Sequence, residues 1–113
     1  MLLSELDISD GQITEFTVQS DTVTILLKDW QEKTYKIIFK DVIGVEAYSP
    51  ENIDLCHIDV KSSSKALQKV CLLVREDENE ITKYSKYSFF SAWSEFPILI
   101  IFGMDVEIIR LTQ

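Results

Sequence analysis

The chain has 113 residues, of which 46% are hydrophobic and 27% are charged. This balance excludes a disordered chain, and the length is typical of a single domain, 1–113, with enough apolar side chains for a core. The net charge of −8 arises within residues 1–60, which carry twelve Asp or Glu against four Lys. Because an acidic surface repels phosphate, we expect neither nucleic acid nor an anionic membrane as partner, whereas a basic protein is compatible with it.

The first residues contain neither the basic segment nor the long apolar segment that together direct secretion. Its longest apolar run is far shorter than a membrane span. Cys56 and Cys71 do not form a CxxC pair. We therefore expect a cytoplasmic protein with reduced thiols, and neither a metal nor a cofactor.

The first half of the chain predicts five strands, because apolar and polar residues alternate along it. The strands are expected at 12–19, 22–29, 33–40, 42–48 and 53–61. Short turns join the first four, which is typical of an antiparallel meander. Gly44, inside the fourth strand, predicts a bulge or a close approach of another part of the chain.

The second half predicts one helix followed by a second meander. Apolar residues at helical spacing and a serine cap favour a helix from about Ser64 to Val74, although Lys65 and Lys69 oppose the helix dipole. The charged stretch 75–80 predicts a solvent-facing loop. Three strands joined by short turns are expected at 85–93, 98–102 and 106–111.

The five consecutive apolar residues Ile98 to Phe102 stand between Pro97 and Gly103, and they predict a strand buried on both faces. Such a strand needs cover on both sides, which the helix and the first meander can supply. We therefore expect an α+β fold that is mainly antiparallel, with about eight strands and one helix near 64–74. A curled sheet, a barrel and a sandwich all remain open. Trp93 is expected in the core.

Candidate catalytic residues are few. The only histidine, His57, shares a strand face with Asp59, and an exposed strand histidine beside a carboxylate explains this pair better than hydrolysis does, because no activated nucleophile accompanies it. Cys56 and Cys71 fall on apolar faces and are expected to be buried. A glycine-rich phosphate loop is absent from the sequence, and 75–80 lacks calcium-binding spacing. We expect no enzyme and no catalytic residues.

Binding is better supported than catalysis. Trp30 stands at the tip of a predicted hairpin among acidic residues, and exposed tryptophans are enriched in protein interfaces. The competing interpretation folds Trp30 back over the sheet edge. The predicted binding surface consists of Asp21, Asp29, Trp30, Glu32, Asp41 and Glu46. The alternative functions are a small-molecule-binding barrel or cup lined by Tyr35, Tyr87, Phe89 and Trp93, and a structural protein.

Three stretches carry a resemblance: DGQITEF at 10–16, DWQEKTYKIIFKDVIGV at 29–45 and FFSAWSEFPILIIFG at 89–103. With them the chain resembles small, β-rich bacterial proteins of uncharacterised function, some of which are grouped with the immunity proteins that neutralise toxins. The resemblance implies a bacterial cytoplasmic protein that binds a protein partner, for example a basic toxin. It implies no catalytic residues. A homodimer also remains open, since exposed sheet edges can pair.

Overall fold

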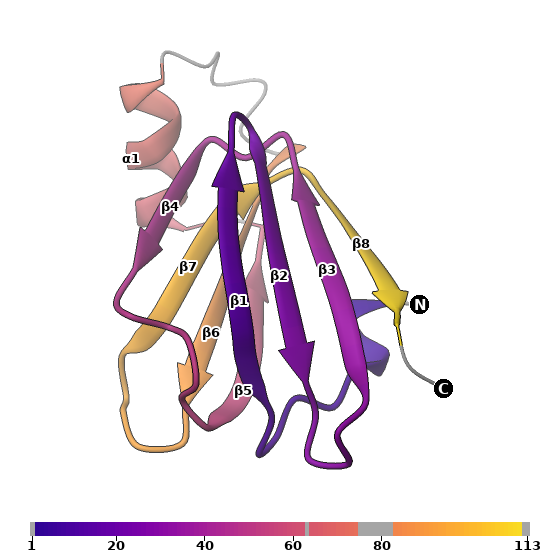
Figure 1. Ribbon diagram of the computed structural model, residues 1–113. Helices are drawn as coiled ribbons and strands as arrows, with labels where there is room; N and C mark the ends of the chain where they lie inside the picture. Colours follow the sequence, from indigo (N-terminus) through magenta and orange to yellow (C-terminus); the bar gives the residue numbers. More distant parts are fainter. Residues whose placement is uncertain (1, 63, 75–82, 112–113) are drawn as a thin grey trace.

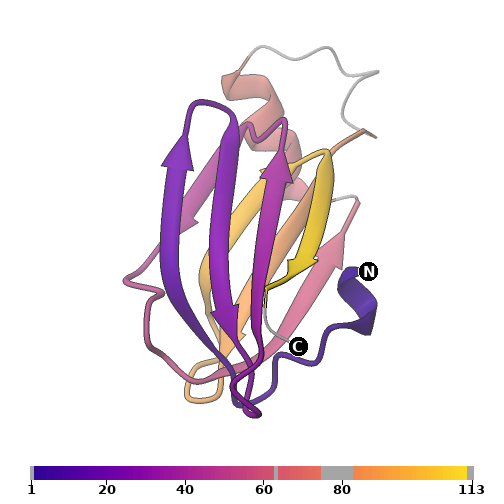
Figure 2. The ribbon, with the colours of Figure 1, turned by 45° about the vertical axis from the view of Figure 1, so that its right-hand side comes forward.

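The computed structural model describes residues 2–62, 64–74 and 83–111, and in these ranges two four-stranded antiparallel sheets face each other (Figures 1 and 2). Sheet A contains, in spatial order, β1 (Gln12–Gln19), β2 (Thr22–Lys28), β3 (Thr34–Lys40) and β8 (Asp105–Arg110). Sheet B contains β4 (Gly44–Ala47), β7 (Pro97–Gly103), β6 (Ser85–Ser91) and β5 (Leu55–Lys61). The remaining elements are a 3-10 turn, η1 (Leu3–Glu5), and a helix, α1 (Lys65–Leu73).

The expected α+β fold is therefore confirmed, and it is an open sandwich rather than a closed barrel. Each predicted strand is present within a few residues of its expected ends. The helix was expected at 64–74 and forms at Lys65–Leu73. The predicted loop at 75–80 lies outside the described residues.

The core fills the space between the two sheets with the side chains that alternation had placed inward. Every second residue of β2 and β3 is buried, from Val23 to Leu27 and from Tyr35 to Phe39. The Phe39 ring meets the rings of Tyr87 and Phe89 edge-on, with centroids 5.0 and 6.1 Å apart. Such edge-to-face pairs fix the relative position of the sheets.

The apolar strand β7 is buried along its length, as predicted, and has a neighbour on each side. Leu99 and Ile101 belong to the core between the sheets, while Ile100 and Phe102 belong to a second cluster with Leu67 and Cys71 of α1. Sheet A and the helix thus cover opposite faces of this strand. An apolar strand needs both covers, because either bare face would leave large aliphatic side chains in water.

The helix forms where its cap and its apolar stripe agree. Ser64 accepts a hydrogen bond from the backbone N–H of Leu67 through its hydroxyl oxygen, at 3.0 Å. This bond satisfies one of the free donors of the first turn, which outweighs the unfavourable placement of two lysines. Across the described ranges, no helix has the length and apolar character needed to cross a bilayer.

Two predicted meanders are wrong in their connections. β4 pairs with β7 in sheet B rather than with β3, and β8 pairs with β3 in sheet A rather than with β7. The two segments in which the chain passes from one sheet to the other lie side by side. The N–H of Ile43 donates to the carbonyl oxygen of Phe102 at 2.8 Å, and the N–H of Met104 donates to the carbonyl oxygen of Lys40 at 3.2 Å. A short turn can bridge two sheets as readily as two neighbouring strands, so turn length did not distinguish the alternatives.

Cys56 is exposed, contrary to the prediction, whereas Cys71 is buried as expected. The cause is an irregularity in β5, where the pairing register with β6 shifts between Leu55 and His57. A bulge of this kind inserts one residue and reverses the alternation beyond it. Leu55 therefore shares the inner face with Ile58, and Cys56 is left outside.

We expect the substitution Gly44→Ala to destabilise the fold, because a Cβ atom there would lie 2.9 Å from Cγ1 of Val70 and 3.2 Å from the Phe102 ring. Overpacking of this kind costs about 1–3 kcal/mol in unfolding free energy. Urea unfolding measures the change. Val70→Ala removes the clashing methyl groups, so the double variant should lose less stability than the sum of the two single losses. Simple additivity would contradict this account.

Stability should also fall at high pH through Tyr87. Burial raises the pKa of its phenol above the ordinary value of 10.0, a hydrogen bond with Ser85 opposes this, and the charge of Asp105 adds to it. The unfolded chain therefore loses its proton first, so the folded state loses stability as the pH rises above about 10. In urea unfolding between pH ~9 and ~11, Tyr87→Phe should lose less stability than the unchanged protein. The exposed Tyr48→Phe should follow the unchanged protein, and identical curves for all three would refute the assignment.

Candidate functional site

The residues of the predicted acidic surface lie on separate parts of the fold. Asp21 and Asp41 are neighbours at one end, where the N–H of Val42 donates to the carbonyl oxygen of Asp21 at 2.8 Å. Trp30 and Glu32 lie in the β2–β3 turn at the opposite end (Figure 1). Glu46 projects from β4 on the outer face of sheet B. The structure therefore does not bring these six residues into one surface.

Trp30 is exposed over 62% of its surface, so it does not fold back over the sheet edge. Its neighbour Asp29 is buried, and one carboxylate oxygen accepts the N–H groups of Gln31 and Lys33 at 2.9 and 2.8 Å. These bonds close the turn from within. Asp29 thus stabilises the turn that carries Trp30, and the Asp29 carboxylate is hydrogen-bonded within that turn.

Trp93, expected in the core, is 82% exposed. Strand β6 ends at Ser91, two residues before Trp93, and the loop 92–96 turns away from the sandwich. Ser91 and Ser94 stabilise this loop by accepting the N–H groups of Trp93 and Phe96 at 3.4 and 3.0 Å. Early termination of the strand therefore carries Trp93 outward.

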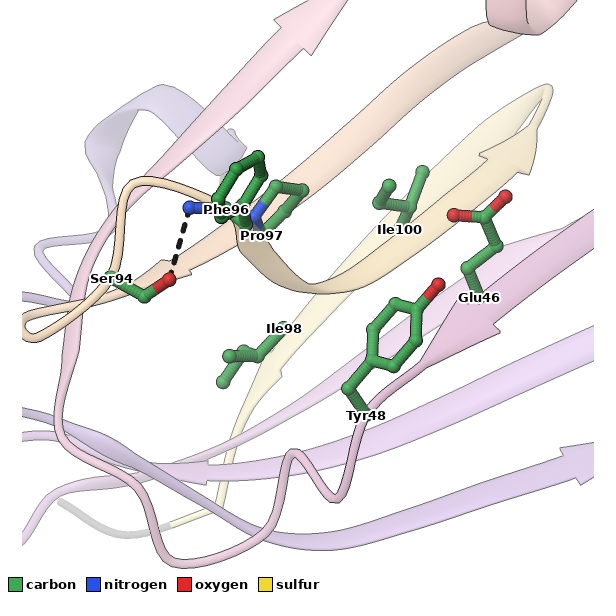
Figure 3. A pocket seen from close by; sticks show the side chains of 7 residues that line it. All are labelled: Glu46, Tyr48, Ser94, Phe96, Pro97, Ile98 and Ile100. Carbon is green, nitrogen blue, oxygen red and sulfur yellow. Dashed lines mark hydrogen bonds between the residues drawn. The ribbon is translucent and has the colours of Figure 1, made fainter.

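Two exposed aromatic side chains flank one region of sheet B, and a third lies in the adjoining loop. Phe96 is 78% exposed and Tyr48 is 64% exposed, and Trp93 lies in the same loop as Phe96. The helix α1 covers the other part of this face, where Gly44 and Phe102 lie beneath it. Beyond the helix, the face is hollowed into a groove of about 470 Å³. We call this feature the aromatic groove; its lining consists of Glu46, Tyr48, Ser94, Phe96, Pro97, Ile98 and Ile100 (Figure 3).

Three chain segments build the aromatic groove. Ile98 and Ile100 of β7 form its floor, and both are buried against the layers beneath. Glu46 pairs with Ile100 across the β4–β7 ladder, and Tyr48 follows where its N–H donates to the carbonyl oxygen of Ile98 at 2.9 Å. Phe96 and Pro97 close the groove from the chain that enters β7 (Figure 3). An apolar floor with aromatic walls is typical of surfaces that bind a partner or a ligand.

Among the residues that the structure describes, Glu46 is the one charged residue in the groove lining. Among the described residues its carboxylate makes neither an ion pair nor a hydrogen bond. Within the described part of the chain, the groove therefore presents one carboxylate without a partner at the edge of a mainly apolar hollow. Comparisons of the chain with protein-family models, with curated proteins and with solved structures found no match.

The predicted catalytic and ligand-binding candidates do not form a site. His57 is exposed and stacks flat on Phe90, with ring centroids 4.6 Å apart, and Asp59 lies 3.8 Å from Lys61. Within the described ranges, no three His, Cys, Asp or Glu side chains are placed to hold a metal ion. The predicted cup is not assembled, since Tyr35, Tyr87 and Phe89 are buried in the core and Trp93 is exposed.

Sequence reasoning selected Glu46 but missed Tyr48 and Phe96. Both aromatic residues stand beside turn formers, Tyr48 before Ser49 and Pro50 and Phe96 before Pro97. An aromatic side chain in such a turn is more often exposed than one inside a strand, because connecting segments run over the surface. The sequence therefore contained a signal that both residues are exposed. It contained no signal that they lie close together, because their proximity depends on the pairing of β4 with β7.

We expect Asp29→Ala to lower the unfolding free energy by about 1–3 kcal/mol, because two backbone N–H groups lose their acceptor in a part-buried turn. Asp29→Asn should lose less, since its amide oxygen can still accept. Glu32→Ala, at an exposed position in the same turn, is the control and should stay within about 0.5 kcal/mol. Chemical unfolding measures all three. An alanine variant as stable as the unchanged protein would exclude the capping role.

Proposed function

We propose that this chain is a non-enzymatic protein-binding module whose contact surface is the aromatic groove. The observation that carries the proposal is the exposure of Tyr48 and Phe96 on the walls of one mainly apolar hollow. Exposed aromatic side chains cost free energy in water and are enriched among residues that dominate binding. A folded domain that presents two of them beside one apolar hollow has a surface suited to a partner.

The dimensions of the groove favour a protein partner. Its volume of about 470 Å³ holds one or two large side chains, and its open rim is formed by residues of a strand edge and a loop. Pockets at the centre of an interface accept anchoring side chains in this way. The described residues of its lining include one carboxylate and no second acid or base of the kind that hydrolysis of a bound group would require.

The charge of the chain supports a basic partner. The net charge of −8 attracts a positively charged protein and speeds its encounter. Trp30 lies in a turn at the same end of the sandwich as the loop 92–96, and it provides a second aromatic contact beyond the groove (Figure 1). In the finer form of the proposal, which rests on the sequence resemblance, the module is an immunity-type protein and the partner is a basic toxin.

The test is capture of the partner by the immobilised protein, compared with capture by the double variant Tyr48→Ala/Phe96→Ala. Removing both walls should weaken binding roughly tenfold or more, because hot-spot aromatic residues carry much of an interface's energy. Both side chains are largely exposed, so the fold should survive, and circular dichroism with thermal unfolding verifies this. The identity of the captured protein tests the finer proposal: a secreted basic toxin supports it.

Trp30→Ala is the matched control, since it removes an equally exposed aromatic side chain from sheet A at the same end. Its effect should be smaller than that of the double variant. If Trp30→Ala abolishes capture while the groove variant binds normally, the partner uses the predicted acidic turn and the assignment to the groove is wrong. Light scattering on the purified protein shows whether the partner is a second copy instead.

A further inference from the structure

The chemistry of the aromatic groove specifies the side chain that it accepts. Tyr48 and Glu46 project from the β4 side, Phe96 and Pro97 stand opposite, and Ile98 lies between them (Figure 3). The groove is therefore apolar along most of its extent and negative at Glu46. A ligand that matches both parts has an aliphatic stem and a cationic end.

Other ligand classes fit less well. A carboxylate or phosphate would meet the Glu46 charge, and no basic residue stands among the described lining residues to compensate it. A purely apolar side chain would cover the Glu46 carboxylate and leave it without a partner, which costs free energy. A lysine or arginine side chain avoids both penalties, because its methylene groups can lie on Ile98 while its charge meets Glu46. The Tyr48 and Phe96 rings add cation–π attraction.

The rest of the chain favours the same class of ligand. With a net charge of −8, two copies of the chain repel each other, whereas a basic surface is drawn toward the groove. We infer that the aromatic groove is a recognition site for a lysine or arginine side chain of the partner protein, with Glu46 as the residue that selects for positive charge. This inference rests on the proposed function, since it names the anchor of the partner in the same groove.

The experiment is an NMR titration of the full chain with three short peptides: acetyl-Gly-Lys-Gly-amide, its arginine analogue and its norleucine analogue. Norleucine keeps the stem of lysine and removes the charge. The cationic peptides should shift backbone signals of residues 46–48 and 94–100, with the norleucine peptide binding roughly five- to tenfold more weakly. Single side chains bind weakly, so dissociation constants of about millimolar are expected.

Glu46→Gln should reduce the affinity for the lysine peptide roughly five- to tenfold and leave that for the norleucine peptide unchanged. Glu15→Gln is the matched control, because it removes the same charge from an exposed position on β1, an edge strand of sheet A. It should leave both affinities unchanged. Raising the salt concentration should weaken binding of the lysine and arginine peptides and leave binding of the norleucine peptide unchanged, because screening acts on the charge.

Three results would overturn the inference: equal binding of lysine and norleucine peptides, shifts scattered over the acidic residues of both sheets, or no shift at the highest peptide concentration. Failure of the inference is distinguishable from failure of the proposed function. If Tyr48→Ala/Phe96→Ala abolishes capture of the protein partner but Glu46→Gln does not, the groove binds a partner through an apolar anchor. If neither variant affects capture, the proposed function fails as well.

Discussion

The strand β7 must be covered on both faces, and most of the architecture follows from this constraint. Its inward side chains, such as Leu99 and Ile101, face sheet A, and its outward Phe102 lies under α1. The helix can approach this closely because Gly44 has no side chain to hold it away. Yet α1 is short, so it covers only part of the outer face, and the aromatic groove forms beside it over Ile98 and Ile100.

The groove also depends on the two adjacent crossings between the sheets. Because the chain leaves sheet A after β3, β4 becomes the edge of sheet B and sets Glu46 and Tyr48 beside β7. Because β6 ends early, the loop 92–96 turns outward and brings Phe96 to the opposite wall. The same strand therefore contributes Leu99 and Ile101 to the core and Ile98 and Ile100 to the floor of the groove.

The candidate site could be predicted only residue by residue. The sequence leaves open whether Trp30 is exposed, and the structure shows that it is; the sequence selects Glu46 without indicating which residues surround it. Asp29 was misjudged, since a carboxylate in a tight turn can be buried by its own backbone. Trp93 was misjudged because its position continued the alternation of β6, while the strand stops two residues earlier. Local pattern does not reveal where pairing ends.

By itself, the sequence determined the elements: alternation located the strands, Ser64 and an apolar stripe located the helix, and the run Ile98 to Phe102 identified the most buried strand. These features are local, because side-chain direction repeats every two residues in a strand and every three to four in a helix. Only the tertiary structure decided which strands pair, that Cys56 lies outside, and that Glu46, Tyr48 and Phe96 share a groove. Those outcomes depend on sheet membership and bulges, which arise from contacts between residues far apart in the chain.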